Sequence, residues 1–272
     1  MNVYEKIYQS WRFEALTPSF TMRGGVRTCG CSRPVGAFDY EKCQSLTEHS
    51  MGMKTLVEAV LNEPSIIPED IAVLGDWTRQ YVVMSKVASI HDAPEAYLDG
   101  DICANGSRDD ISQDARERSI FEQYLLCYPA HLQASMMSCY TEFQEKSSPR
   151  GWLLYCADKT DAILTVLEYA SLASPGSVFN RCHATDQDRM NAEICQSDAP
   201  YEVWLVQFFD DITKYPGYVG ISQIFVNIIL AARENVSRVN GKNLPIRSEV
   251  AWIERFNKVK QVIFPCSITL NP

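Results

Sequence analysis

The sequence predicts an all-α protein, a helical bundle followed by an additional helical C-terminal region. Apolar residues recur at intervals of three and four over several long segments, which is the period of an amphipathic helix. Strand signals are scarce, and residues 261–264 are the only short piece that reads as extended. Proline and glycine fall between the apolar segments, where they end helices.

The first third of the chain is expected to hold three helices, with a loop between the first and the second. The helices are predicted over residues 4–16, 40–61 and 71–90. The loop covers residues 21–36, a segment with four glycines. Pro68 precedes two acidic residues and marks the start of the third helix, because proline fits the first turn and acidic side chains suit the positive end of the helix dipole.

The middle of the chain is expected to hold two further helical segments. They are predicted over residues 113–143, with a break near Pro129, and over residues 152–173. Residues 99–112 are polar and contain glycine, and residues 147–151 contain serine, proline and glycine, so both segments are interpreted as loops. The helix over residues 152–173 is strongly apolar, which predicts that it lies in the core.

We expect the chain to divide after residue 175, where a Ser-Pro-Gly sequence ends the apolar helix. Residues 1–175 would form the core with an N-terminal helix and loop, and residues 176–272 a helical extension packed on that core. The extension is expected to contain three or four helices. Within it, residues 220–232 are apolar but include Ser, Gln and Asn, which predicts a buried helix and not a membrane span.

Charge and hydropathy exclude two classes of partner. The net charge is −9 and the pI is near 5.0, and no cluster of Lys and Arg forms the basic stripe that a duplex nucleic acid requires. A single nucleotide stays compatible with this net charge, since a metal ion and a few cations neutralise a phosphate locally.

No apolar run reaches the roughly 18–20 residues of a bilayer span. The N-terminal segment lacks the pattern of a signal peptide, so we expect a cytoplasmic protein.

Ten cysteines raise the question of disulfides or structural zinc. No CxxC pair occurs, and Cys29-Gly-Cys31 is the only close pair, whereas structural zinc sites usually take paired ligands from two short loops. With no export signal, most of the thiols are expected to be free and packed as small apolar groups.

Two of the four histidines lie beside acidic residues, and a third acidic position lies in the apolar helix. His49 follows a glutamate, His91 precedes Asp92, and Asp158 lies among leucines and isoleucines. A buried carboxylate needs a cation or hydrogen-bond donors, because burying it unpaired costs several kcal/mol. Lys159 is a poor partner for Asp158 on this reading, since adjacent helical residues point about 100° apart. Two interpretations stay open: Asp158 binds a metal ion, or it lies on an exposed stripe.

His91 and Asp92 can reach one ion together only at a helix end or bend, and Pro94 predicts such a distortion. Imidazole and carboxylate ligands together suit Mn, Fe, Co or Zn. Two histidines and two aspartates would leave two positions of an octahedral ion for water and a phosphoryl oxygen. Glu95 lies one helical turn after Asp92 and is therefore the candidate for proton transfer to or from the reacting groups.

Three local sequences, in order, resemble the HD-domain superfamily of metal-dependent phosphohydrolases. Residues 45–50 (SLTEHS) are similar to the helix start S-V-x-E-H-S of that family. Residues 91–98 (HDAPEAYL), followed by Asp101-Ile102, are similar to the H-D-A-x-E-A-x-x-x-D-I segment of its 5′-deoxynucleotidase-like branch, which is common in phage genomes. Residues 158–161 (DKTD) are similar to the D-K-x-[ED] helix of the same branch.

This resemblance covers roughly residues 20–175 and implies an HD-domain helical bundle that hydrolyses a phosphate ester or anhydride. It implies one divalent metal ion per site, of Mn, Co, Fe, Zn or Mg. The implied metal ligands are His49, His91, Asp92 and Asp158. It also implies Glu95 as the acid–base residue.

Two cationic side chains are candidates for phosphate binding. Many members of the family carry an arginine shortly before the first histidine, and Arg33 precedes His49 by 16 residues. Lys159 follows the last ligand directly. For each of them a solvated surface position is the competing interpretation. The aromatic residue that often follows the arginine in this branch is Pro34 here, an extra residue is inserted before Ile102, and the region after residue 175 matches no pattern of the family.

The expected function is hydrolysis of phosphate from (deoxy)nucleotides, either mono- or triphosphates, with a small-molecule nucleotide as the partner. One alternative is an HD hydrolase of a cyclic or signalling nucleotide, but second-messenger enzymes often use additional histidines and this chain has four. Another is a nucleotide-binding sensor on an inactive scaffold, which the intact ligand pattern argues against. The sequence leaves the oligomeric state open, although relatives of the family are often dimers or larger.

Overall fold

The computed structural model describes residues 2–8, 46–67, 71, 77–94, 110–172, 212 and 218–240. The long helices are α2 (Leu46–Leu61), α4 (Trp77–Ile90), α5 (Asp110–Leu125), α6 (Ala130–Glu145), α7 (Pro149–Leu172) and α10 (Val219–Asn240). A short helix over residues 3–8 precedes them. These residues contain no strand, so the prediction of an all-α fold is confirmed for the part of the chain that the structure describes.

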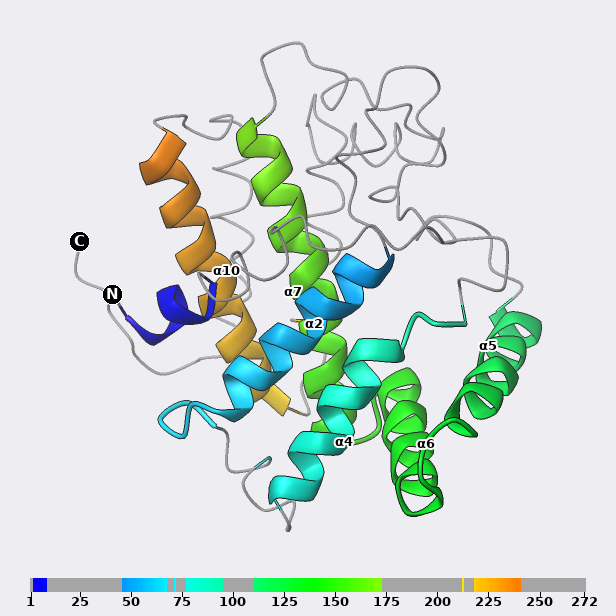
Figure 1. The fold of residues 1–272 in the computed structure, drawn as a ribbon. Coiled ribbons are helices and arrows are strands. Elements are labelled where there is room, and N and C mark those ends of the chain that lie inside the picture. The colour runs from blue at the N-terminus through cyan, green and yellow to red at the C-terminus, as the bar shows by residue number, and fades with distance from the viewer. Residues whose placement is uncertain are drawn as a thin grey trace, which may run out of the picture.

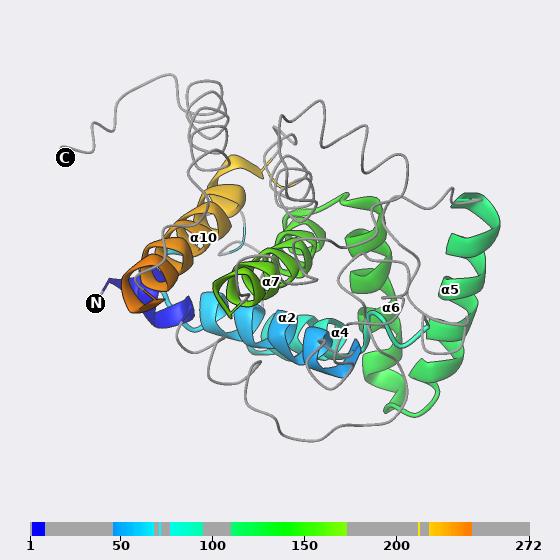
Figure 2. The ribbon, with the colours of Figure 1, turned by 90° about the horizontal axis from the view of Figure 1, so that it is seen from above.

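Helix α7 lies at the centre of the bundle and packs against α2, α6 and α10. Figure 1 shows α10 and α7 side by side, with α2 crossing in front of α7. Helix α4 packs against α2 and α6, and α5 lies at the outer edge beside α6 (Figure 2). The core is formed by the apolar faces of these helices, with fully buried residues that include Leu56, Val87, Leu153, Ile163 and Ile228.

Helix α5 begins within a segment that the sequence predicted as a loop. The loop was expected over residues 99–112, but α5 starts at Asp110. Aspartate favours the first turn of a helix, where backbone N–H groups lack partners and the dipole is positive, so this polar segment already contains a helix start. The predicted break near Pro129 is confirmed, because α5 ends at Leu125 and Pro129 caps the start of α6.

Helix α7 also begins earlier than predicted, because residues 149–151 of the expected connector are helical. The Ser148 hydroxyl accepts a hydrogen bond from the Gly151 N–H at 3.1 Å, and the Ser148 carbonyl accepts one from the Trp152 N–H at 2.8 Å. Pro149 occupies the first helical position, where its missing N–H costs nothing. Ser148 and Pro149 therefore start α7 and do not interrupt the chain.

The turn between α6 and α7 is tight and depends on a close backbone approach. Helix α6 ends at Glu145 and is followed by its C-cap residue Lys146, which has φ 55°. The Ser147 N–H returns to the Glu142 carbonyl at 3.2 Å. A Cβ atom at Gly151 would lie 2.1 Å from the same carbonyl oxygen. Only a glycine fits at this contact, so Gly151 sets how closely α7 approaches α6.

A polar cluster around Arg150 joins the start of α7 to α6 and α4. Arg150 donates from Nε to Glu142 Oε2 at 3.0 Å, and its other nitrogens reach Gln80 Oε1 at 3.0 Å and Ser138 Oγ at 3.3 Å. Burial disfavours the charge of Glu142, but its hydrogen bonds to Arg150 and two serines outweigh that effect and lower its pKa. Bidentate pairing of arginine with a carboxylate fixes geometry as well as charge, so this cluster holds three helices in register.

Helix α10 is attached to α7 through a buried hydrogen bond. The Trp152 indole N–H donates to Ser222 Oγ at 3.0 Å, and both side chains are buried. The buried helix predicted over residues 220–232 is thereby confirmed, since α10 spans Val219–Asn240 and most of its first half is buried. The division after residue 175 stays a prediction, because the residues on its C-terminal side up to 211 lie outside the described part.

We expect Ser222→Ala to lower the free energy of unfolding by about 1–2 kcal/mol, because it leaves the buried indole N–H of Trp152 without its acceptor. Urea unfolding followed by circular dichroism measures the change. Ser119→Ala, at an exposed position of α5, is the matched control and should change stability little. Equal effects of the two substitutions would show that the hydrogen bond to α10 contributes nothing to stability.

None of the described helices combines the length and the apolar character that crossing a membrane would require.

Candidate metal centre

Three segments that are far apart in the sequence meet at one buried point. Helix α2 contributes His49, the turn after α4 contributes His91 and Asp92, and α7 contributes Asp158. All four side chains are buried. They meet because α2 packs against both α4 and α7, as Figure 1 shows for the crossing of α2 over α7.

The imidazole nitrogens and carboxylate oxygens of this group converge. His49 Nε2 lies 2.9 Å from Asp158 Oδ1 and 3.4 Å from Asp92 Oδ2. His91 Nε2 lies 3.0 Å from Asp92 Oδ1 and 3.8 Å from Asp158 Oδ1. One ligand atom each from His49, His91 and Asp92 lies within 4.8 Å of the others. The four residues predicted as metal ligands are thus side by side.

The turn after α4 aims His91 into the group. Helix α4 ends at Ile90, and the Ala93 N–H returns to the Ile90 carbonyl at 3.0 Å, as expected for a distortion before Pro94. His91 Nδ1 donates to the Ala88 carbonyl at 2.9 Å. Since a carbonyl only accepts, the proton lies on Nδ1, and Nε2 is left to face the carboxylates.

The donor set fits a divalent cation. Metal–ligand distances of about 2.0–2.2 Å put neighbouring ligand atoms about 3 Å apart, and the N–O separations here run from 2.9 to 3.8 Å. His91 Nε2 is buried and has no hydrogen-bond partner with acceptable geometry among the described residues. A buried polar atom without a partner costs about 1–3 kcal/mol, and a bound cation would supply the missing interaction.

The electrostatics of the group also favour a positive charge. Burial lowers the pKa of His91, but Asp92 and Asp158 oppose it and raise the pKa to about 10. Burial would raise the pKa of Asp158, but the Lys159 ammonium and the two imidazoles hold it well below its usual range. Asp158 therefore stays ionised and favours a cation beside it.

Lys159 does pair with Asp158, contrary to the expectation from helical geometry. Its Nζ lies 2.9 Å from Asp158 Oδ2, and it also lies over the Tyr155 ring at 5.4 Å from the centroid. The angle of about 100° between adjacent residues applies to the Cα–Cβ directions, whereas a four-carbon side chain can bend back along the helix. Asp158 itself is buried, so the interpretation as an exposed stripe is wrong.

Asp161 is a buried acidic residue of the site that the sequence analysis did not single out. Its Oδ2 lies 2.5 Å from His49 Nδ1, and its side chain has no exposed surface. It stands one helical turn after Asp158, so both carboxylates face α2. That spacing, in an apolar helix, was the signal that could have identified it.

Two of the other predicted site residues, Glu95 and Arg33, lie outside the described residues. His131 is an exposed residue of α6. His183 and the Cys29–Cys31 pair are also outside the described part. Of the cysteines within it, Cys127, Cys139 and Cys156 are free thiols, as expected.

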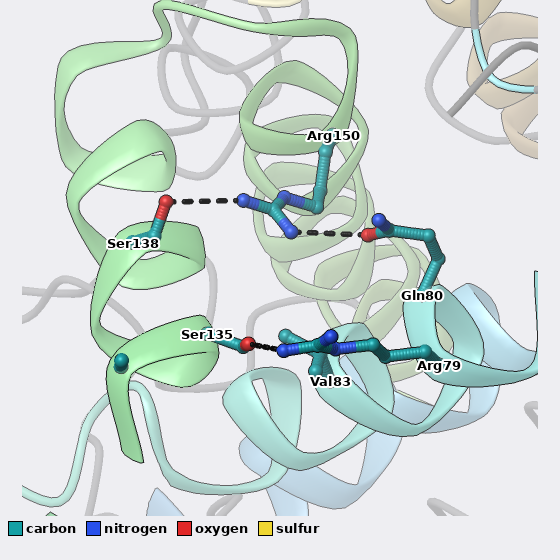
Figure 3. A pocket seen from close by; sticks show the side chains of 7 residues that line it. Arg79, Gln80, Val83, Ser135, Ser138 and Arg150 are labelled. Atoms are coloured by element: carbon teal, nitrogen blue, oxygen red, sulfur yellow. Dashed lines mark hydrogen bonds between the residues drawn. The ribbon is translucent and has the colours of Figure 1, made fainter. Parts of the chain in front are cut away.

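A cavity of about 430 Å³ lies between α4 and α6, away from the candidate ligands. Figure 3 shows Arg79 reaching Ser135 and Arg150 reaching Ser138, with the Gln80 side chain directed toward Arg150. The residues that line it are Arg79, Gln80, Val83, Ala134, Ser135, Ser138 and Arg150. Arg79 donates to Ser135 Oγ at 2.5 Å, and Arg150 is paired with Glu142, so these cations serve contacts between helices.

One comparison with known proteins gives a match. A model of the HD domain matches residues 80–197, a segment that contains His91, Asp92 and Asp158 but starts after His49. The match supports the HD-domain superfamily and does not distinguish branches within it. No curated protein and no solved structure matches the chain.

Proposed function

Because residues 80–197 match the HD domain, we propose that this chain is a metal-dependent phosphohydrolase that removes phosphate from (deoxy)nucleotides. The observation that carries the proposal is the buried convergence of His49, His91, Asp92 and Asp158. The nucleotide substrate, either a mono- or a triphosphate, rests on the resemblance to the 5′-deoxynucleotidase-like branch.

We assign the four residues as ligands of one divalent ion, of Mn, Co, Fe, Zn or Mg. When bound, such an ion polarises a phosphoryl oxygen and lowers the pKa of a water molecule. His49 and His91 present Nε2 to the centre, and Asp92 and Asp158 supply the negative charge. The helices hold these side chains in place, so little reorganisation is required when substrate binds.

The remaining roles belong to residues beside the centre. We propose the Lys159 ammonium, which lies 2.9 Å from Asp158 Oδ2, for binding a phosphate oxygen next to the proposed ligands. Glu95 follows the turn that carries His91 and Asp92, and we propose it for proton transfer. Arg33 is proposed for phosphate binding on its position before His49 alone. The partner is a small-molecule nucleotide, without duplex nucleic acid or membrane.

The test is phosphate release from a panel of deoxynucleoside mono- and triphosphates with Mn²⁺, Co²⁺, Mg²⁺ or Zn²⁺. Wild type is expected to turn over at least one nucleotide. Asp92→Ala removes one carboxylate ligand and is expected to lower that rate at least about 100-fold. Glu145→Ala, at an exposed acidic position of α6, is the matched control and should retain the wild-type rate.

A folded wild-type protein that binds metal and nucleotide but releases no phosphate would overturn the proposal. That result would favour a nucleotide-binding scaffold. Circular dichroism of Asp92→Ala separates loss of the ligand from loss of the fold.

A further inference from the structure

We propose that Asp161 is a positioning residue that holds the Nδ1 proton of His49, so that Nε2 is the nitrogen available to a metal. The inference rests on the metal centre of the proposed function and assigns a role to a residue outside the ligand set. Its basis is the contact of 2.5 Å between His49 Nδ1 and Asp161 Oδ2, with both side chains fully buried.

The geometry excludes Asp161 from the ligand set. The two nitrogens of an imidazole point to opposite sides of the ring. His49 Nε2 faces Asp92 and Asp158, and His49 Nδ1 faces Asp161. Asp161 therefore lies behind the ring, on the side away from the other carboxylates.

The direction of the hydrogen bond follows from the chemistry of the two groups. An ionised carboxylate only accepts, so the proton between them belongs to Nδ1. That proton fixes the tautomer whose Nε2 carries the lone pair, and the negative charge of Asp161 makes that lone pair more basic. His91 is held in the same tautomer by the Ala88 carbonyl, which accepts a hydrogen bond from His91 Nδ1 at 2.9 Å. Both imidazoles are thus held with Nε2 toward the centre, one by a neutral acceptor and one by a charged one.

The helix that carries Asp158 also carries Asp161, so one rigid element positions a ligand and orients another. Asp158 and Asp161 are three residues apart on α7 and meet His49 from two sides. Asp161 thereby holds the ring at Nδ1, and a cation between Nε2 and Asp158 would hold it at the other nitrogen. A shift of α7 would disturb both contacts together.

The test is the affinity for Mn²⁺, measured by isothermal titration calorimetry on wild type and Asp161→Asn. An asparagine can offer its amide N–H to Nδ1, which favours the wrong tautomer, or its carbonyl, which accepts a weaker hydrogen bond. Either way the dissociation constant is expected to rise about 10–100-fold. Glu58→Gln is the matched control: it neutralises a half-buried carboxylate on α2 that accepts from Ser85 at 2.5 Å, and it should leave the affinity unchanged.

A second measurement needs no substitution at Asp161. Proton–nitrogen correlation spectra of the imidazoles in the Zn²⁺-loaded wild type are expected to show His49 protonated at Nδ1 and bound through Nε2, with His49→Gln identifying its signals. A carboxylate that only stabilised the fold would not determine which nitrogen of His49 carries the proton and which binds the ion.

The outcomes separate the two proposals. A wild type that binds no divalent ion overturns the metal centre and the role of Asp161 with it. A wild type that binds Mn²⁺, together with an Asp161→Asn variant whose affinity lies within twofold of it, overturns the role of Asp161 alone. A His49 bound through Nδ1 in the zinc-loaded protein overturns it as well.

Discussion

Adding Mn²⁺ at one hundred times its dissociation constant is expected to raise the free energy of unfolding by about 2.7 kcal/mol. The unfolded chain cannot bring His49, His91 and Asp158 together, so the ion binds the native state far more tightly and stabilises it by mass action. For a chain of this size the melting temperature should rise by about 5–10 °C. Differential scanning fluorimetry measures the shift, and a chelator should reverse it.

The same experiment on His91→Ala is expected to show almost no shift. The substitution removes the buried His91 Nε2, which has no hydrogen-bond partner with acceptable geometry among the described residues, and with it one of the proposed ligands. His131→Ala removes an exposed imidazole of α6 and should keep the full shift. If His91→Ala responds to Mn²⁺ as strongly as His131→Ala does, the ion binds elsewhere.

Gly151→Ala is expected to destabilise the protein by at least about 2 kcal/mol. In an ordinary helix this substitution would stabilise by about 1 kcal/mol, because alanine has the higher helix propensity. Here the added Cβ would lie 2.1 Å from the Glu142 carbonyl oxygen and 2.3 Å from its carbon, and both are backbone atoms of α6. The two helices must move apart, which also strains the Arg150 cluster and shifts the helix that carries Asp158.

Gly220→Ala is the matched control, since Gly220 is an exposed helical residue of α10. It should leave stability unchanged or raise it by up to about 1 kcal/mol. Chemical denaturation measures the change in the free energy of unfolding for both variants. The expected change is a loss for Gly151→Ala, and none or a gain for Gly220→Ala. A Gly151→Ala variant as stable as wild type would mean that α6 and α7 separate at no cost.

The sequence predicted which residues lie together at the candidate metal centre, because they belong to short patterns with specific spacing. His49, His91, Asp92 and Asp158 were all identified, and the structure brings them together. The predictions that failed are those that depend on contacts between residues far apart or on the conformation of a side chain. The start of α7 was predicted too late, because Ser148 and Pro149 are residues that usually interrupt a helix. In the structure the Ser148 hydroxyl accepts a hydrogen bond from the Gly151 N–H and so starts the helix.

Side-chain reach explains the other misses. Lys159 was expected to avoid Asp158, but its flexible chain bends back to 2.9 Å from the carboxylate. Asp161 was matched only as part of the DKTD segment, and its contact with His49 could be recognised only once α2 was known to pack on α7. Pairings between distant helices of this kind are not encoded in any short window of sequence.

The wide separation of the ligands along the chain has a consequence for folding kinetics. The steps from His49 to His91 and from His91 to Asp158 are 42 and 67 residues, so closing the site requires α2, α4 and α7 to be docked first. Contacts that form only after the transition state change the unfolding rate and leave the folding rate nearly untouched. A bound metal ion should therefore lower the unfolding rate constant, which stopped-flow experiments measure from the unfolding arm of the chevron. The lifetime of the native state should lengthen as the occupancy of the site rises.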